Sequence, residues 1–101
     1  MDTAEEYPLE TYEPSVALFS ALAHPLRLAM CHHIMDQPHT VSEIHNCLGV
    51  SQPLASHHLK LLKEAQVITS WQEGRKTFYQ LADQHIKHII QDVQQHTKEQ
   101  R

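Results

Sequence analysis

The sequence predicts one mainly α-helical domain with a small β-hairpin, its elements following the order ααααββα. Three observations predict this class. The chain has 101 residues, 41% of them hydrophobic, which suits a single domain with one modest core. Only two glycines are present, so most of the chain should form regular structure with few tight turns. Apolar residues recur at helical spacing along most of the chain, and only residues 67–81 resemble a pair of strands.

The first two helices should follow a loose acidic arm. Residues 1–13 hold scattered acids with no apolar period, so we expect a flexible arm there and a folded domain over residues 14–101. Ser15 can cap the first helix, which should end just before Pro25 because a residue that precedes proline avoids the helical region. Pro25 suits the first turn of a second helix that runs to about Gln37. The apolar stripes of these two helices are Val16, Leu18, Phe19 and Leu22, then Leu26, Met30 and Ile34.

Two short capped helices come next. Thr40 and Glu43 form a capping box, in which each residue satisfies a free N–H group at the start of a third helix. Gly49 should end this helix as a left-handed cap, and Ser51 should cap a fourth helix that ends near Ala65. Two such helices joined by a short turn indicate a helix-turn-helix. The buried face of the fourth helix should consist of Ala55, Leu59 and Leu62.

A hairpin and one more helix complete the predicted domain. Residues 67–71 and 77–81 are typical of strands, and Glu73-Gly74 is a turn signal between them. Asp83 should begin the last helix. The apolar side chains of that helix are Ile86, Ile89, Ile90 and Val93.

Charge and composition limit the classes of function. The net charge is −4, but residues 1–23 contain five acids and no lysine or arginine, whereas residues 55–79 contain four cations against two acids. A basic face that binds nucleic acid therefore remains possible. No apolar run approaches the roughly 20 residues of a membrane span, and the acidic start does not resemble a signal peptide. With only two cysteines and no disulfide framework, we expect a cytoplasmic protein.

The outer face of the fourth helix and the tip of the hairpin predict DNA binding. Side chains that can reach base edges in a major groove, or phosphates, gather on the polar side of that helix. They are Gln52, Pro53, Ser56, His57 and Lys60. Arg75 and Lys76 place two cations on the hairpin turn, which suits a wing that lies along the DNA backbone or in a minor groove. Together these features predict a winged helix-turn-helix, although a solvated hairpin tip is the simpler interpretation of Arg75 and Lys76 alone.

Three segments resemble the winged-helix repressors of the ArsR/SmtB family. They are LFSALAHPLRLAMCHHI, TVSEIHNCLGVSQPLASHHLKLLKEAQVI and EGRKTFYQLAD, and the resemblance covers roughly residues 15–100. It implies a homodimeric bacterial repressor that binds an inverted-repeat operator and releases it when a metal or another inducer binds. It also implies that Gln52, Pro53, Ser56 and His57 read DNA and that Arg75 and Lys76 belong to the wing.

The last helix carries a candidate metal site. His85 and His96 are eleven residues apart, which is about three helical turns and about 16 Å along the axis, so one straight helix cannot bring both to one ion. Two antiparallel copies can, because Asp83 and His85 of one copy then meet His96 and Glu99 of the other. Asp83 must lie at or before the helix start to reach the same ion. Two imidazoles and two carboxylates suit tetrahedral Zn²⁺. The family resemblance implies zinc sensing, with Co²⁺ or Cd²⁺ also able to bind.

The family resemblance extends to this pattern. D-x-H-x₁₀-H-x₂-E matches the zinc site on the last helix of the family position for position. The resemblance also implies that the second ring nitrogen of His96 donates to the backbone carbonyl of Gln66. Thr40 and Ser42 stand where other members carry metal-binding cysteines, so a soft-metal site is not expected there. We expect Cys31 and Cys47 to be buried core thiols, with a redox or metal role as the alternative for each.

The leading hypothesis is a metal-responsive repressor that acts as a dimer, with zinc as the expected metal. One alternative is a metal-independent winged-helix regulator that responds to a redox signal, a small molecule or a partner protein. Another is a small metal-binding protein with no role on DNA. The simpler interpretation of the four candidate ligands is that they are polar residues on a solvated helix. An enzyme is not expected, because the sequence contains no nucleophile–base pair or phosphate-binding loop, and a closed four-ligand zinc offers no position for a substrate.

Overall fold

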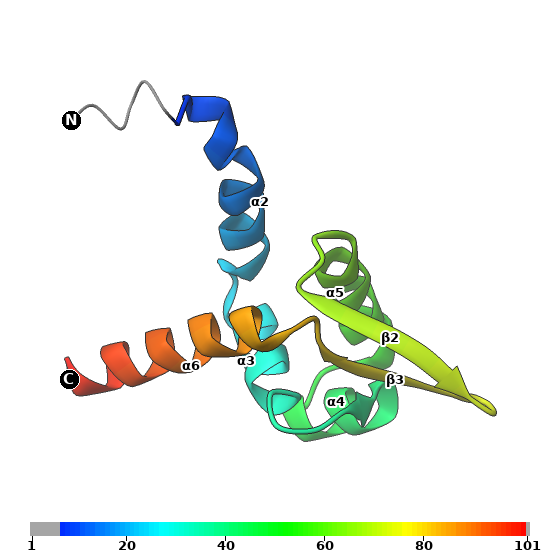
Figure 1. Cartoon of the computed structure of the whole chain (residues 1–101). Coiled ribbons are helices and arrows are strands. Elements are labelled where there is room, and N and C mark those ends of the chain that lie inside the picture. The colour runs from blue at the N-terminus through cyan, green and yellow to red at the C-terminus, as the bar shows by residue number, and fades with distance from the viewer. Residues whose placement is uncertain (1–6, 101) are drawn as a thin grey trace.

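The computed structural model describes residues 7–100 and confirms the predicted order of helices and hairpin strands (Figure 1). A short strand and a single 3₁₀ turn are added to that order. The elements are η1 (Leu9–Tyr12), α2 (Glu13–Leu22), α3 (Pro25–His33), β1 (His39–Thr40), α4 (Val41–Leu48), α5 (Gln52–Glu64), β2 (Ile68–Glu73), β3 (Lys76–Leu81) and α6 (Gln84–Glu99).

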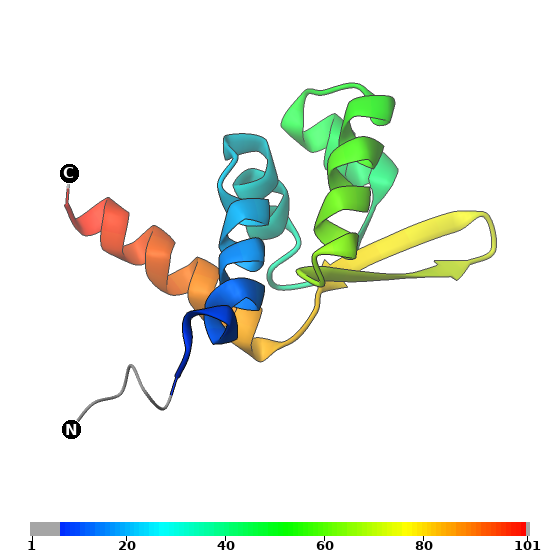
Figure 2. The ribbon, with the colours of Figure 1, turned by 90° about the horizontal axis from the view of Figure 1, so that it is seen from above.

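The molecule is elongated, with principal extents of 54 × 34 × 22 Å. The β2–β3 hairpin extends to one side, and α6 projects to the other, as both views show (Figures 1 and 2). Helices α4 and α5 pack on each other next to the hairpin, while α3 contacts α2, α4, α5 and α6. The helix-turn-helix and the predicted metal-binding helix therefore lie at opposite ends of one small domain.

One hydrophobic core joins all five helices to the hairpin. Met30, Ile44, Leu59 and Val67 are completely buried in its centre, and they come from α3, α4, α5 and the segment before β2. Ala21 and Leu22 of α2, together with Ile86 and Ile90 of α6, are buried at its margin. The predicted face of α5 is confirmed, because its three residues are all fully buried: Ala55, Leu59 and Leu62.

Local sequence signals set most helix ends. Both hydrogen bonds of the capping box are present: Glu43 N donates to Thr40 Oγ1 over 3.1 Å, and Thr40 N donates to Glu43 Oε1 over 2.8 Å. Gly49 ends α4 with a φ of +69°, the left-handed conformation that glycine adopts at low cost. The side chain of Ser51 accepts a hydrogen bond from Leu54 N and caps α5 as predicted.

The sheet has three antiparallel strands in the order β1-β3-β2. Glu73 pairs with Lys76, so the hairpin turn consists of Gly74 and Arg75, and Gly74 has a φ of +63°. Strand β1 was not predicted, because two residues are too few to show an alternating pattern. Its Thr40 pairs with Phe78 and thereby ties the start of α4 to the wing.

Three predicted boundaries were wrong. Helix α2 begins at Glu13, before the expected cap Ser15, with a proline in its first turn and no side-chain cap. Helix α3 ends at His33, and a turn over residues 34–37 separates it from Pro38, so the helix does not reach Gln37. Of the predicted acidic arm, residues 1–6 lie outside the described residues, and Leu9–Tyr12 forms a 3₁₀ turn.

Replacing Thr40 with alanine should lower the free energy of unfolding by about 1 kcal/mol, because the backbone N–H group of Glu43, in the first turn of α4, loses its acceptor. Urea unfolding followed by circular dichroism measures the loss. Thr40→Ser keeps the hydroxyl group and should recover most of the stability. Ser42→Ala, at an exposed position in the same helical turn, is the control. Equal unfolding midpoints for Thr40→Ala and Ser42→Ala would contradict the role of the capping box.

Candidate DNA-binding surface and metal-binding helix

Helix α5 presents a polar face opposite its buried one. Its helical period places the apolar residues on the core and leaves the residues between them in solvent. All five side chains that the sequence predicts to contact DNA from this helix are exposed: Gln52, Pro53, Ser56, His57 and Lys60. The polar face carries no acid before Glu64, the last residue of the helix.

The hairpin tip and the start of α5 meet at one surface depression. Gln52 of α5 lines it together with Arg75 and Lys76 of the wing, as does the first turn of α4. Glu43 lies there too, and the hydrogen bond from the Thr40 backbone holds the pKa of its carboxyl below the usual value. The fold thus brings the two predicted groups of DNA-contacting residues to one side of the molecule.

A buried histidine on α5 was missed by the sequence analysis. His58 is only 8% exposed and accepts a hydrogen bond at Nδ1 from Arg27 Nε of α3, 3.0 Å away. Burial lowers the pKa of His58 below its usual value, and the neighbouring His24 and Arg27 lower it further. The signal was available in the sequence, because position 58 lies three residues after Ala55 and so shares its buried face.

Asp83 occupies the position that a shared metal site requires. Its backbone is extended, with φ −163° and ψ −177°, so Asp83 is the N-cap residue that precedes the first turn of α6. The direction of its side chain is therefore not set by the helical repeat. Its Oδ1 atom accepts a hydrogen bond from Ile86 N over 3.0 Å. The prediction that Asp83 begins the last helix is therefore confirmed.

The other three candidate ligands are exposed along α6. His85 lies in the first turn, whereas His96 and Glu99 lie in the last two. Glu99 Oε2 accepts a hydrogen bond from Gln95 over 2.8 Å. Within residues 7–100 of a single chain, no three histidine, cysteine, aspartate or glutamate side chains converge on a point that could hold an ion.

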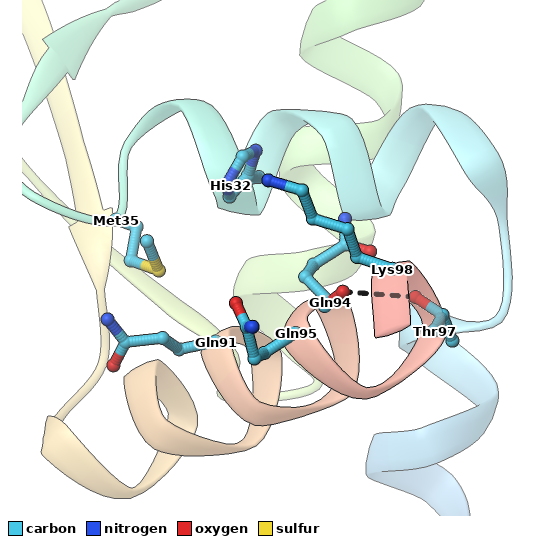
Figure 3. Close-up of a pocket in the computed structure, with 7 residues that line it drawn as sticks. All are labelled: His32, Met35, Gln91, Gln94, Gln95, Thr97 and Lys98. Carbon is cyan, nitrogen blue, oxygen red and sulfur yellow. Dashed lines mark hydrogen bonds between the residues drawn. The ribbon is translucent and has the colours of Figure 1, made fainter. Parts of the chain in front are cut away.

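The candidate ligands lie outside the pocket between α6 and α3. The side of α6 that approaches α3 forms a polar pocket (Figure 3), and none of the four ligands lines it. On an ideal helix, this pocket side lies roughly 160° from the direction of His85 and His96. The residues that line the pocket are His32, Met35, Gln91, Gln94, Gln95, Thr97 and Lys98.

The end of α5 and the start of α6 are joined by backbone hydrogen bonds. Val67 N donates to the carbonyl of Leu62 over 3.0 Å, and Ala82 N donates to the carbonyl of Val67 over 2.9 Å. Gln66, which directly precedes Val67, has a φ of +63° and is the one non-glycine residue of the described chain in the left-handed region. Asp83 directly follows Ala82, so a candidate metal ligand lies one residue from this connection to the recognition helix.

The two cysteines differ in their surroundings. Cys31 is completely buried, as predicted, and burial raises the pKa of its thiol to about 12. The prediction that Cys47 is buried was wrong: its side chain is exposed, with Sγ 3.7 Å from Nδ1 of His33. Helix α4 is short and buries only the stripe around Ile44, and Cys47 lies at the edge of that stripe.

The helix pair with its basic hairpin defines a winged helix-turn-helix protein. A family model described as a helix-turn-helix domain matches residues 22–70. The HTH-type transcriptional repressor SmtB of Mycobacterium tuberculosis H37Rv is 40% identical over 92 residues, which are 91% of this chain and 68% of that protein. The chain belongs to the ArsR/SmtB family of winged-helix transcriptional repressors, a family of regulators and not of enzymes.

Other similar proteins agree with this assignment. The SmtB homolog of Synechocystis is 30% identical over 95 residues, which are 94% of this chain and 72% of that protein. A cadmium resistance regulator, the CadC homolog of Staphylococcus aureus, is 27% identical over 99 residues, or 97% of this chain and 78% of that protein. A homodimeric winged helix-turn-helix domain, Mb0332 from Mycobacterium bovis, has a TM-score of 0.83 at 21% identity, covering 99% of this chain and 90% of that one.

None of the helices in the described part of the chain has the length and apolar character that a membrane span needs.

Replacing His57 with alanine should weaken binding to a specific DNA sequence by about 1–3 kcal/mol, because the side chain lies on the exposed face of α5 and can contact base edges. Fluorescence anisotropy with a selected duplex and with a scrambled one measures the change. Zinc affinity should stay the same, since α5 carries none of the candidate ligands. Unchanged affinity for the selected duplex would exclude His57 from DNA reading.

Proposed function

We propose that this protein is a cytoplasmic, zinc-responsive repressor that binds an inverted-repeat operator as a homodimer and leaves it when zinc binds. The single observation that carries the zinc assignment is the ligand pattern of α6, with His85 and His96 three turns apart and Asp83 extended before the helix. Co²⁺ and Cd²⁺ suit the same donors. The relative named as a cadmium resistance regulator supports a metal as the inducer.

The donor set fits a closed zinc site. Two imidazoles and two carboxylates are ligands that Zn²⁺ accepts in tetrahedral geometry. Asp83 uses Oδ1 for its helix cap, which leaves Oδ2 for an ion, and Glu99 meets Gln95 through only one of its oxygens. When bound, zinc would supply a fixed link between α6 and α6 of the partner copy. Asp83 and His85 from one chain, with His96 and Glu99 from the other, would hold it.

Exposed apolar side chains support the dimer. Val16 and Phe19 of α2 are 60% and 55% exposed, and Val93 of α6 is 46% exposed. Phe19 and Val93 border the same apolar depression between the two helices. Burying such side chains against a second copy contributes about 25 cal/mol for each Å² removed from water. On an ideal helix Val93 lies within roughly 80° of His85, so the same side of α6 serves the dimer contact and the metal ligands.

Coupling between the metal and DNA sites would run through α6 into α5. A metal-bound histidine generally donates its second ring nitrogen to a neighbouring acceptor. For His96 we propose the Gln66 carbonyl, at the left-handed turn that directly follows α5. Within one chain, the Val67–Ala82 hydrogen bond also joins Asp83 to that turn. Zinc would thereby change the relative placement of the two recognition helices, with a coupling free energy of about 1–3 kcal/mol.

The purified protein should be a dimer, and Phe19→Glu should convert it to a monomer, because a carboxylate would be buried in the apolar contact. Sedimentation velocity measures the mass. The monomer should also bind zinc far more weakly, since one chain supplies only half of each site. Thr69→Glu, at an exposed position on β2, is the control and should remain dimeric. A monomer that binds zinc with full affinity would overturn the shared site.

His96→Gln should uncouple zinc from DNA. The variant keeps a polar side chain, but it lacks the two ring nitrogens needed to bind metal and to donate a hydrogen bond at once. Its DNA affinity without metal should stay near that of the wild type, and zinc should no longer cause the roughly 5–150-fold loss expected of allosteric coupling. Anisotropy titrations with and without zinc measure both quantities.

Cys47→Ser is the control for this experiment, and its response to zinc should be normal. If His96→Gln still leaves DNA on addition of zinc while Cys47→Ser does not, the sensor lies on α4 and not on α6.

A further inference from the structure

The side chain of Arg27 makes hydrogen bonds to two other helices, and one of its partners is a buried histidine. Its Nε atom donates to Nδ1 of His58 on α5 over 3.0 Å, and its Nη1 atom donates to the carbonyl of Ala21 on α2 over 3.2 Å. Arg27 itself belongs to α3 and is half-buried. Arg27 thus links α3 to α5 through His58 and to α2 through the Ala21 carbonyl. His58 is the neighbour of the DNA-reading candidate His57.

This contact exists only when His58 is neutral. Arginine has donors and no acceptor, so Nδ1 of His58 must be the unprotonated nitrogen of its ring. Protonation would place a hydrogen on Nδ1, directed at the Nε–H group of Arg27. The hydrogen bond would then become a contact between two donors that both carry positive charge.

The surroundings of His58 offer nothing that would stabilise an imidazolium. The charged and titratable groups that face its ring are His24 from the turn before α3, Arg27 from α3 and His57 from α5 itself. The rings of His24 and His58 lie 4.7 Å apart. His24 also uses Nδ1 as an acceptor, from Leu26 N over 3.2 Å. No carboxylate is among these groups, and the side chain is buried.

We propose that neutral His58 is a positioning residue for the recognition helix, and that its protonation in mild acid detaches α5 from Arg27 and weakens DNA binding. The proposal rests on the proposed function only in requiring that the protein binds DNA. It involves neither zinc nor the ligands of α6.

The expected sign separates this effect from general electrostatics. Protonating exposed histidines adds positive charge to the protein and strengthens its attraction to phosphates, so DNA binding without a switch should tighten as the pH falls. Buried His58 has its pKa held below the usual value, because burial disfavours its charged form. Its neutral form therefore persists through neutral pH, and its protonation at lower pH should reduce DNA affinity instead.

The test uses the full chain, chelator to remove metal, and a duplex that the wild type selects from a random pool at about pH 8. Affinity is measured from about pH 8 to about pH 5.5, each protein being normalised to its own value at the upper limit. Wild-type affinity should fall several-fold, with a slope of no more than one proton for each chain. His58→Asn should show no fall, because its Oδ1 atom can replace Nδ1 as the acceptor for Arg27 and does not titrate. His32→Asn, at an exposed position on α3 outside the DNA-reading face, is the control and should fall as the wild type does.

A wild-type profile in His58→Asn, or a flat profile in His32→Asn, would overturn the proposal. NMR of the wild type without DNA provides an independent test: the His58 ring and the Arg27 Nε–H signal should titrate with one midpoint, below the usual histidine pKa. Separate midpoints would also overturn it. This measurement is decisive even if His58→Asn does not fold. Failure to select any duplex at about pH 8 would instead count against DNA binding, and so against the proposed function.

Discussion

The rest of the structure depends on the complete burial of one face of α5. Ala55, Leu59 and Leu62 are fully buried, and burying each leucine contributes about 1.5–3 kcal/mol. The core beneath them receives side chains from every other helix and from the base of the hairpin. Because the buried face fixes the rotation of the helix, the opposite face is presented to solvent in one orientation. DNA reading requires that orientation to be fixed before the two molecules meet.

The same small core leaves α2 and α6 only partly covered. Each of these helices buries two residues in the chain and exposes further apolar side chains, such as Phe19 and Val93. The candidate metal ligands lie at the two ends of α6, too far apart for one ion. A second copy of the chain would resolve both deficits at once, since it would cover the apolar side chains and complete each set of ligands. In the proposed function, the sensing chemistry would therefore lie between two chains.

Communication between the two ends of the domain needs a stiff connection. The turn after α5 provides one, because Val67 bonds to Leu62 on one side and to Ala82 on the other. Gln66 holds a left-handed backbone at this turn, a conformation that costs about 1 kcal/mol or more for a residue with a side chain. On the opposite side of α5, Arg27 holds His58 against α2 and α3. Metal and acidity would therefore act on the recognition helix through different contacts.

The sequence by itself determined the elements whose ends depend on neighbouring residues. Three caps, formed by Thr40 with Glu43, by Ser51 and by Asp83, each satisfy an N–H group three residues away, and so their roles were predictable from spacing alone. The helical period also predicted the buried and polar faces of α5. The ligand pattern of α6 follows from the same period, and whether its four residues bind one ion stays a prediction.

Only the tertiary structure decided the contacts between residues far apart in the chain. Arg27 and His58 are 31 residues apart, and no local pattern pairs them. Strand β1 exists because Thr40 lies beside Phe78, and Cys47 is exposed because α4 turns another side toward the core. Caps and helical faces depend on short-range geometry, which the order of residues carries directly. These other features depend on how helices pack around a shared core, which is settled only when the whole chain has folded.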